Sequence, residues 1–166
     1  IRRGGASFWP LRPSGRDQTR RVTFLLGCTY FTSHLIMPSP LYSLQVDLPS
    51  GGIDRSYPIV IGRGVLGDGE GFAELLGDSP VVLVSNDTVA PLYMSRVRDA
   101  LGKAREVTEV ILPDGEDQKH LESANQIWQK ALEDHHERRS VFIALGGGVI
   151  GDLTGYSAAC FLRGVD

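Results

Sequence analysis

Apolar and polar residues begin to alternate regularly at residue 41. Residues 41–48 alternate apolar and polar side chains, and residues 57–61 form a second short apolar-rich run. Turn-forming residues separate the two runs, so the pattern predicts a pair of strands arranged like a hairpin. The stretch 67–76 that follows predicts a short helix, which its glycines weaken.

The chain from residue 81 to 163 repeats a strand-then-helix pattern. The first and last of the predicted strands are apolar runs, which is typical of strands that are covered on both faces. We expect strands at 81–85, 107–112 and 141–145, and helices at 89–101, 121–135 and 146–163. This alternation predicts an α/β fold, a Rossmann-like parallel sheet with helices on both faces, whose ligands gather beyond the carboxyl ends of the strands.

Length and composition limit the function. With 166 residues the chain is long enough for one α/β domain. A net charge of −3 gives no electrostatic argument for nucleic-acid binding, and no apolar run is long enough to cross a membrane. The cysteines are Cys28 and Cys160, and we place Cys160 on the apolar face of the last helix with Leu153 and Tyr156. Two cysteines suggest neither a disulfide framework nor a thiolate metal site, which favours a reducing compartment.

Residues 1–36 differ from the rest of the chain. They hold six arginines against a single acid, Asp17, without sustained periodicity. Organelle transit peptides have such a composition. Alternatively Met37 is the natural start and the upstream residues are a non-native extension, which we favour because the first predicted strand begins a few residues later. Under both interpretations we expect residues 1–36 to be disordered and residues 37–166 to form the α/β domain.

A glycine-rich turn, residues 146–152, joins the last predicted strand to the last helix. Glycines let the backbone approach a diphosphate closely and aim helix N-terminal N–H groups at it. The turn therefore predicts a nucleotide site, although its match to G-x-G-x-x-G is weak evidence alone and a turn that only packs helix on sheet is the alternative. Asp152 is placed in the first helical turn, where the helix dipole favours a carboxylate that can accept hydrogen bonds from ligand hydroxyls.

The other two strand ends also carry polar residues. Asn86 lies in the cluster 85–88 after the first strand, and an acidic loop, residues 113–119, follows the second. The first cluster can equally be a helix cap and the second a solvated surface. Because the ends of parallel strands meet on one edge, we expect the three loops to converge on a common ligand.

Three further residue groups have plain structural interpretations. His135 and His136 stand at a predicted helix end and are expected to be solvated, since basic groups complement the dipole there. Trp128 has helical spacing with apolar neighbours and is expected in the core. Arg163 either complements a helix C-terminus or clamps a phosphate or carboxylate.

Taken together, these motifs closely resemble the 3-dehydroquinate synthase family. The resemblance extends from about Tyr42 to the last residue and rests on 112–119, 143–156 and 163–165, with support from 57–59 and 84–86. Dehydrogenases of the glycerol and iron-dependent alcohol type share the architecture and a glycine-rich turn. The long match at 145–156 followed by Arg163 resembles the synthase instead.

The resemblance implies a lyase of the shikimate pathway, which serves aromatic amino-acid biosynthesis. Such an enzyme converts 3-deoxy-D-arabino-heptulosonate 7-phosphate to 3-dehydroquinate and phosphate, with NAD as a catalytic cofactor that is not consumed. By motif position, the resemblance assigns NAD binding to Asn86, Asp114, Gly115, Glu116, Asp117, Gln118, Lys119, Gly147, Gly148, Val149, Ile150, Gly151 and Asp152. Arg163 would hold the substrate phosphate across the interface of a homodimer.

The same resemblance places several parts of the enzyme beyond residue 166. These are the ligands of a zinc or cobalt ion, the catalytic lysines and a helical C-terminal domain. We therefore expect this chain to be an N-terminal fragment, without catalytic or metal-ligating residues and inactive alone. A glycerol-dehydrogenase-type oxidoreductase, another sugar-phosphate cyclase and a non-catalytic NAD-binding module remain alternatives. The expected partner is a sugar phosphate and not nucleic acid or membrane, and the expected location is the cytoplasm, or a plastid if residues 1–36 are a transit peptide.

Overall fold

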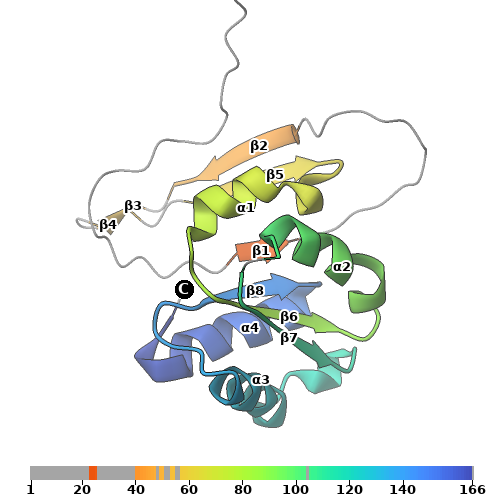
Figure 1. The fold of residues 1–166 in the computed structure, drawn as a ribbon, viewed down its shortest axis with the longest axis vertical. Coiled ribbons are helices and arrows are strands. Elements are labelled where there is room, and N and C mark those ends of the chain that lie inside the picture. The colour runs from red at the N-terminus through yellow and green to blue at the C-terminus, as the bar shows by residue number, and fades with distance from the viewer. Residues whose placement is uncertain are drawn as a thin grey trace, which may run out of the picture.

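The centre of the molecule is a parallel four-stranded sheet in the order β1-β8-β6-β7 (Figure 1). The computed structural model describes residues 23–25, 40–47, 49–50, 53–54, 57–103 and 105–165. The sheet strands are β1 (Thr23–Leu25), β6 (Val81–Asn86), β7 (Val107–Leu112) and β8 (Val141–Leu145). β6 lies between β7 and β8 and pairs Val84 with Val110 on one side and Ala144 on the other. The predicted parallel sheet is confirmed.

Helices cover both faces of the sheet, as predicted. They are α1 (Gly69–Leu76), α2 (Ala90–Leu101), α3 (Leu121–Glu133) and α4 (Gly148–Cys160), with the short 3-10 turns η1 (Val65–Gly67), η2 (Glu116–Gln118) and η3 (Phe161–Arg163). α1 and α2 lie on one face and α3 and α4 on the other (Figure 1). Val81 and Leu83 pack toward α1 and α2, and Val82 and Val84 toward α3 and α4, all four with 0% exposure. Burying each such side chain stabilises the folded state by about 1.5–3 kcal/mol. β6 therefore contributes strongly to the hydrophobic cores on both faces of the sheet.

A separate antiparallel pair of strands precedes this domain. β2 (Pro40–Val46) pairs with β5 (Tyr57–Gly62), and Leu44 lies opposite Ile59. The chain between them contains a small pair, β3 (Pro49–Ser50) and β4 (Ile53–Asp54). The pair lies beside α1, above the sheet in Figure 1. The predicted hairpin-like unit is confirmed.

Within residues 1–36 the structure describes only β1, which lies beside β8. Thr23 pairs with Ile143 and Leu25 with Leu145. These three residues are therefore a strand, because β8 offers an edge with unpaired backbone groups to an extended segment. The rest of that segment, including Cys28, lies outside the described residues, and its disorder stays a prediction.

The buried face of α4 differs from the predicted one. Tyr156 is 48% exposed and Cys160 is also exposed. Of the predicted apolar residues, Leu153 is buried, and it is joined by small polar residues such as Thr154 and Ser157. A helix that packs against both β8 and α3 must bring its backbone close, so small residues form the contact and the hydrophobic pattern is misleading. The helix also ends at residue 160 and not at 163.

Trp128 lies where α3 meets α4 and packs against the core, as predicted, but it is only partly buried. Its indole Nε1 donates to the carbonyl of Ser157 over 3.0 Å, and its ring centroid lies 6.0 Å from that of Tyr156. Indole N–H groups at partly buried sites usually find such an acceptor. The residue joins α3 to α4.

His136 is buried, which corrects the prediction of a solvated residue. Its Nε2 lies 2.8 Å from the Thr108 hydroxyl, and its Nδ1 lies 3.0 Å from the Ser140 hydroxyl. Thr108 donates its only proton to Asp134 over 2.7 Å, so it must accept from His136 Nε2–H and leave Nδ1 to accept from Ser140. Burial lowers the pKa of His136, although Glu106 and Asp134 act in the opposite direction. The chain reversal after α3 puts His136 inward and leaves His135 exposed, as predicted for the latter.

In the part of the chain that the structure describes, no helix has the length and apolar character that crossing a membrane requires.

Candidate functional site

Asp114 connects the loops that follow β6 and β7. The Asn86 amide Nδ2 donates to Asp114 Oδ1 over 2.6 Å, and the Thr88 hydroxyl donates to Oδ2 over 3.2 Å. In the reverse direction the Asp114 backbone N–H donates to Asp87 Oδ1 over 3.1 Å. These bonds hold the two strand ends together, so the predicted convergence of the loops is confirmed at this point.

Asn86 also stabilises the turn that leads from β6 to α2. Its Oδ1 accepts from the Val89 backbone N–H over 2.8 Å, and the residue is only 5% exposed. Both the oxygen and the nitrogen of its side-chain amide are hydrogen-bonded, so the buried Asn86 links Asp114 to the turn before α2. The helix itself begins at Ala90, and no side chain caps it at Val89, so the predicted helix cap is corrected to a turn-stabilising bond. Contact of Asn86 with a ribose stays a prediction.

Gly115 turns the chain from Asp114 into η2. Its φ of 123° is one that side chains rarely tolerate, and a Cβ there would collide with the Asp117 carboxylate. Glycine is therefore required at this position by the fold alone. The turn delivers Glu116 and Lys119 to the edge beside α4.

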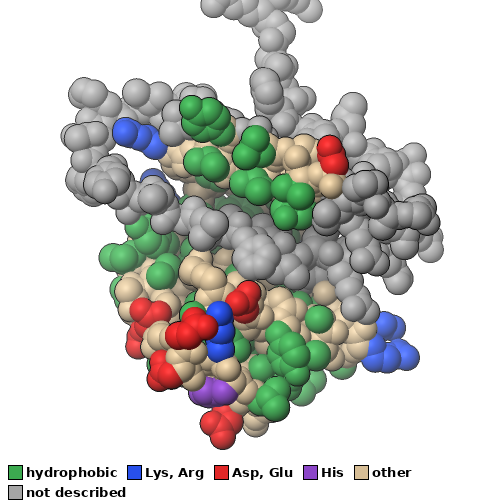
Figure 2. Space-filling view, turned by 180° about the vertical axis from the view of Figure 1, so that it is seen from behind, with side chains coloured by type: hydrophobic (Ala, Val, Ile, Leu, Met, Phe, Trp, Pro, Cys, Tyr) green, Lys and Arg blue, Asp and Glu red, His purple; other side chains and the backbone are tan. Residues whose placement is uncertain are grey.

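Lys119 connects the loop after β7 to α4. Its Nζ lies 2.9 Å from Glu116 Oε1 and 3.0 Å from Asp152 Oδ2. Hydrogen bonds to Glu116 and then to Asp152 raise the pKa of Lys119 above its usual 10.5, so it is a cation at neutral pH. Figure 2 shows a basic side chain set between acidic ones in the lower part of the molecule. All three strand ends are thereby linked into one edge.

The glycine-rich turn has room in front of it. A Cβ on Gly146 would lie 2.9 Å from the Ile150 side chain, so internal packing explains that glycine. A Cβ on Gly147 or Gly148 would meet nothing within 4 Å, and Gly147 has an ordinary φ of −86°. Packing and backbone conformation therefore leave these two glycines unexplained, whereas an external group that approaches the backbone explains both.

The N-terminus of α4 faces the same space. The helix begins at Gly148, and no side chain caps it at Gly147. Asp152 is consequently the fifth helical residue and not a residue of the first turn, which corrects the prediction. It extends from the side of the helix to Lys119, because the helix begins later than the apolar pattern indicated. The N-terminal N–H groups of α4 are left available for an anion.

The remaining predicted residues of the turn contribute mainly backbone. Ile150 is 1% exposed and belongs to the core, and Val149 packs against the same core. The Gly151 N–H donates to the Gly147 carbonyl over 2.9 Å. The Gln118 amide Nε2 donates to Asp117 Oδ2 over 3.4 Å, and the residue is half-buried in the loop. Direct contact of these residues with a ligand stays a prediction.

Arg163 is not at this edge. It follows α4, which runs back along the sheet, so it lies at the opposite, amino edge of the strands. Its side chain is exposed and its φ is 75°, next to Leu162 with a φ of 46°. The structure therefore unites the other predicted residues and separates Arg163 from them.

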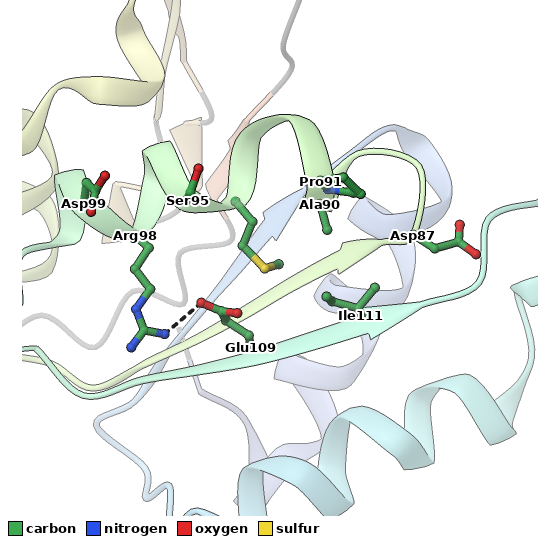
Figure 3. Close-up of a pocket in the computed structure, with 9 residues that line it drawn as sticks. Asp87, Ala90, Pro91, Ser95, Arg98, Asp99, Glu109 and Ile111 are labelled. Atoms are coloured by element: carbon green, nitrogen blue, oxygen red, sulfur yellow. Dashed lines mark hydrogen bonds and ion pairs between the residues drawn. The ribbon is translucent and has the colours of Figure 1, made fainter.

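A groove that the sequence analysis missed runs between α2 and β7 (Figure 3). It has a volume of about 570 Å³ and extends from Asp87 past Ile111 to an ion pair, in which Arg98 Nη1 lies 2.7 Å from Glu109 Oε1. The signal for it was the alternation in β7, where Glu109 and Ile111 fall on the α2 side of the sheet and are not fully covered by that helix. The groove touches the site edge only at Asp87.

Among the described residues, no group of three or more His, Cys, Asp or Glu side chains is arranged to hold a metal ion.

Comparisons with known proteins agree with this geometry. Residues 109–166 match a family model described as 3-dehydroquinate synthase N-terminal. A 3-dehydroquinate synthase of Shewanella frigidimarina is 47% identical over 113 residues, which are 68% of this chain and 32% of the relative. One of Azotobacter vinelandii is 48% identical over 126 residues, 76% of this chain and 33% of the relative. The chain thus spans about a third of the length of the curated relatives it matches.

Solved structures resemble the fold. A crystal structure of 2-deoxy-scyllo-inosose synthase has a TM-score of 0.64 at 22% sequence identity, over 75% of this chain and 34% of that one. A second structure of such an enzyme, with the same TM-score, is complexed with carbaglucose-6-phosphate, NAD+ and Co2+. At this identity the likeness concerns the fold alone.

Proposed function

Because the chain belongs to the 3-dehydroquinate synthase family, we propose that it forms the NAD-binding edge of a 3-dehydroquinate synthase. The observation that carries the proposal is the open space in front of Gly147 and Gly148, beside a lysine that is already held at the same edge. The whole enzyme would convert 3-deoxy-D-arabino-heptulosonate 7-phosphate to 3-dehydroquinate and phosphate. Its place would be the shikimate pathway, in the cytoplasm.

The edge offers two kinds of partner to a dinucleotide. The N-terminal N–H groups of α4 and the Lys119 ammonium suit the negative diphosphate. The carboxylates of Asp114 and Asp152 suit ribose hydroxyls, which donate protons to them. Asn86 holds Asp114 in place by a hydrogen bond and would lie on the adenosine side of the bound dinucleotide. The residues present therefore fit NAD, and a solved enzyme of the same fold holds NAD+.

NAD, when bound, would accept a hydride from a substrate carbon and later return it. This chain's residues would position it: α4 and Lys119 hold the diphosphate, and the packed Ile150 and Gly146 keep the turn rigid. The described residues do not fit a zinc or cobalt site, so no step is assigned to a metal here. We also propose that Arg163 contacts the phosphate of the sugar-phosphate substrate from the second copy of a homodimer, since it lies on the edge away from its own glycine turn.

Calorimetric titration of the chain with NAD tests this function. Gly148→Val places a branched side chain in the open space and should weaken NAD binding by at least about tenfold, or 1.4 kcal/mol. The matched control is Gly67→Val, because Gly67 lies in η1, away from the turn, where a Cβ would make only an ordinary 3.6 Å contact with Arg96. Equal NAD affinity of the folded Gly148→Val variant and the parent chain would contradict the proposal.

A further inference from the structure

β7 forms one edge of the parallel sheet. It pairs with β6 on one side, and no other described strand lies on its outer side. The Val81 N–H donates to the Glu106 carbonyl, and the Asp87 N–H donates to the Leu112 carbonyl, each over 2.9 Å. Because the N–H and C=O of one strand residue point to the same side, the even-numbered residues of β7 direct their backbone groups to β6. The backbone groups that face the outer edge therefore belong to Val107, Glu109 and Ile111.

This outer edge is regular and carries little protection. Proteins commonly protect an exposed edge with a proline, a lysine, a bulge or a covering element. β7 contains neither proline nor lysine, and its register with β6 runs without a shift from Val107 to Leu112. Its one charged residue, Glu109, is paired with Arg98 of the chain's own α2. The edge is thus a row of backbone donors and acceptors with which an extended chain can pair.

The groove between α2 and β7 lies beside this edge, on the α2 side of the sheet (Figure 3). Its lining is largely apolar in the middle, where Ala90 and Met94 are each 6% exposed and Ile111 is 52% exposed. Side chains of neighbouring strands that share a face stand next to each other. Alternate side chains of an added strand would therefore stand beside Glu109 and Ile111, over the groove.

Charges at the two ends of the groove favour a basic partner. Asp87 lies at one end, and Asp99 lies at the other end with the ion pair of Arg98 and Glu109 (Figure 3). Among the described residues that line the groove, Arg98 is the one base against three carboxylates. Its guanidinium is already held by Glu109 over 2.7 Å. A ligand with a positive charge on each side of an apolar group is complementary to this arrangement.

We infer that the outer edge of β7 and the groove beside it bind an extended segment of a partner protein as an added strand. The backbone of the segment pairs with the odd-numbered residues of β7, and an apolar side chain packs on Ile111 and Met94. Basic side chains on either side of it meet the carboxylates at the two ends. The inference goes beyond the proposed function and needs no bound NAD, so either can fail without the other.

Fluorescence anisotropy of a labelled peptide mixed with the full chain tests this contact. The probe is the heptapeptide Thr-Lys-Thr-Ile-Thr-Lys-Thr, whose lysines and isoleucine share one face of a strand. Its sequence reads the same in both directions, so it serves parallel and antiparallel addition equally. We expect saturable binding, at least about tenfold tighter than that of Thr-Glu-Thr-Ile-Thr-Glu-Thr at low ionic strength. Equal affinities, or no saturable binding of the first peptide at millimolar concentration, would overturn the inference.

Two substitutions of Ile111 separate the backbone contact from the side-chain contact. Ile111→Ala shortens the side chain and keeps the N–H. Ile111→Pro also removes that N–H, which does not pair with β6, and edge strands tolerate proline at such positions. We expect the proline variant to bind the lysine peptide at least about tenfold more weakly than the alanine variant does. Equal binding by the two folded variants would refute the addition of a strand.

A third substitution tests the groove itself. Ile111→Lys puts a cation between the expected positions of the two lysines and should weaken binding at least about tenfold. Leu132→Lys is the matched control, because Leu132 is 54% exposed on α3, on the opposite face of the sheet. This control should bind the peptide as the parent chain does, and equal losses in both variants would contradict the assigned surface. Circular dichroism and urea unfolding show which variants are folded.

Discussion

The Lys119 ammonium and the Asp152 carboxylate, 3.0 Å apart, link the loop after β7 directly to α4. Glu116 holds the same ammonium from the other side at 2.9 Å. An incoming diphosphate would therefore compete with two carboxylates for this lysine, and the carboxylates would be released to accept ribose hydroxyls. The existing ion pairs position the Lys119 ammonium before the ligand arrives. Exchanging these carboxylates for the diphosphate costs little binding free energy.

Replacing Lys119 should weaken NAD binding without unfolding the chain. Lys119→Met removes a cation that ion pairs with Glu116 and Asp152 hold beside the glycine turn, and we expect at least about a tenfold loss of NAD affinity. Lys130→Met is the control, because Lys130 also lies between two carboxylates, Glu133 and Asp134, but on the far part of α3. Calorimetry should show a loss for the first variant only. A similar loss in both would mean that net charge and not position matters.

Gly148→Ala should separate stability from binding. Alanine favours a helix over glycine by about 0.5–1 kcal/mol, and the space around Gly148 is open, so the unfolding free energy should rise. The same methyl group stands where the diphosphate would approach, so NAD affinity should fall. Urea denaturation and NAD titration of one sample measure both. A variant that gains stability and keeps full affinity would remove the ligand explanation for this glycine.

The buried His136 should make stability depend on pH. Its pKa is lowered in the folded state, mainly by burial, so the unfolded chain binds a proton more readily. The stabilising contribution is therefore complete above the usual pKa of 6.5 and is lost as the pH falls through the lowered value. His136→Gln should flatten this part of the stability curve, whereas His135→Gln, at the exposed neighbour, should preserve it. Identical curves for the two variants would contradict the assignment.

At neutral pH, His136→Ala should also destabilise the chain. It leaves the hydroxyls of Thr108 and Ser140 buried without their shared partner, at a cost of about 2 kcal/mol. Chemical denaturation at pH 8 measures it. A change of only a few tenths would show that water replaces the imidazole.

The Leu162→Gly variant should be more stable toward unfolding than the Leu162→Ala variant. Its φ of 46° lies in the left-handed region, which costs a non-glycine residue about 1 kcal/mol. Leu162 is 40% exposed, and both Leu162→Ala and Leu162→Gly remove the contacts of its side chain. The two variants therefore differ chiefly in this backbone strain. We expect the glycine variant to be more stable by about 1 kcal/mol in thermal or urea unfolding. The reverse order would show that the turn relaxes in solution.

The sheet was the part of the fold that the sequence predicted best. β7 and β8 have the predicted bounds. β8 is covered on both faces and appears as an unbroken apolar run, whereas β7 alternates buried and more exposed residues, and both patterns are typical of strands. The loops at their ends converge as expected, since parallel topology alone brings Asn86, Asp114 and Lys119 to one edge. For these features local pattern and topology were sufficient.

Other features depend on tertiary contacts that no local pattern contains. The buried face of α4 includes Thr154 and Ser157 because closeness to α3 matters more there than hydrophobicity. His136 is inward because the chain reverses at His135, and its two hydrogen-bond partners are Ser140, in the same turn, and Thr108, in β7. The apolar pattern likewise does not show that Asp152 lies past the first turn of α4 and pairs with Lys119.

Gly148 and Arg163 stand at opposite ends of α4, about 20 Å apart by the rise of a 13-residue helix. If both serve one reaction, a single copy does not bring them together, and each reaction centre in a two-fold pair takes its glycine turn from one chain and its arginine from the other. Two defective alleles, Gly148→Val and Arg163→Ala, would then complement one another in the complete gene product. Each mixed pair would contain one centre with both defects and one centre with neither.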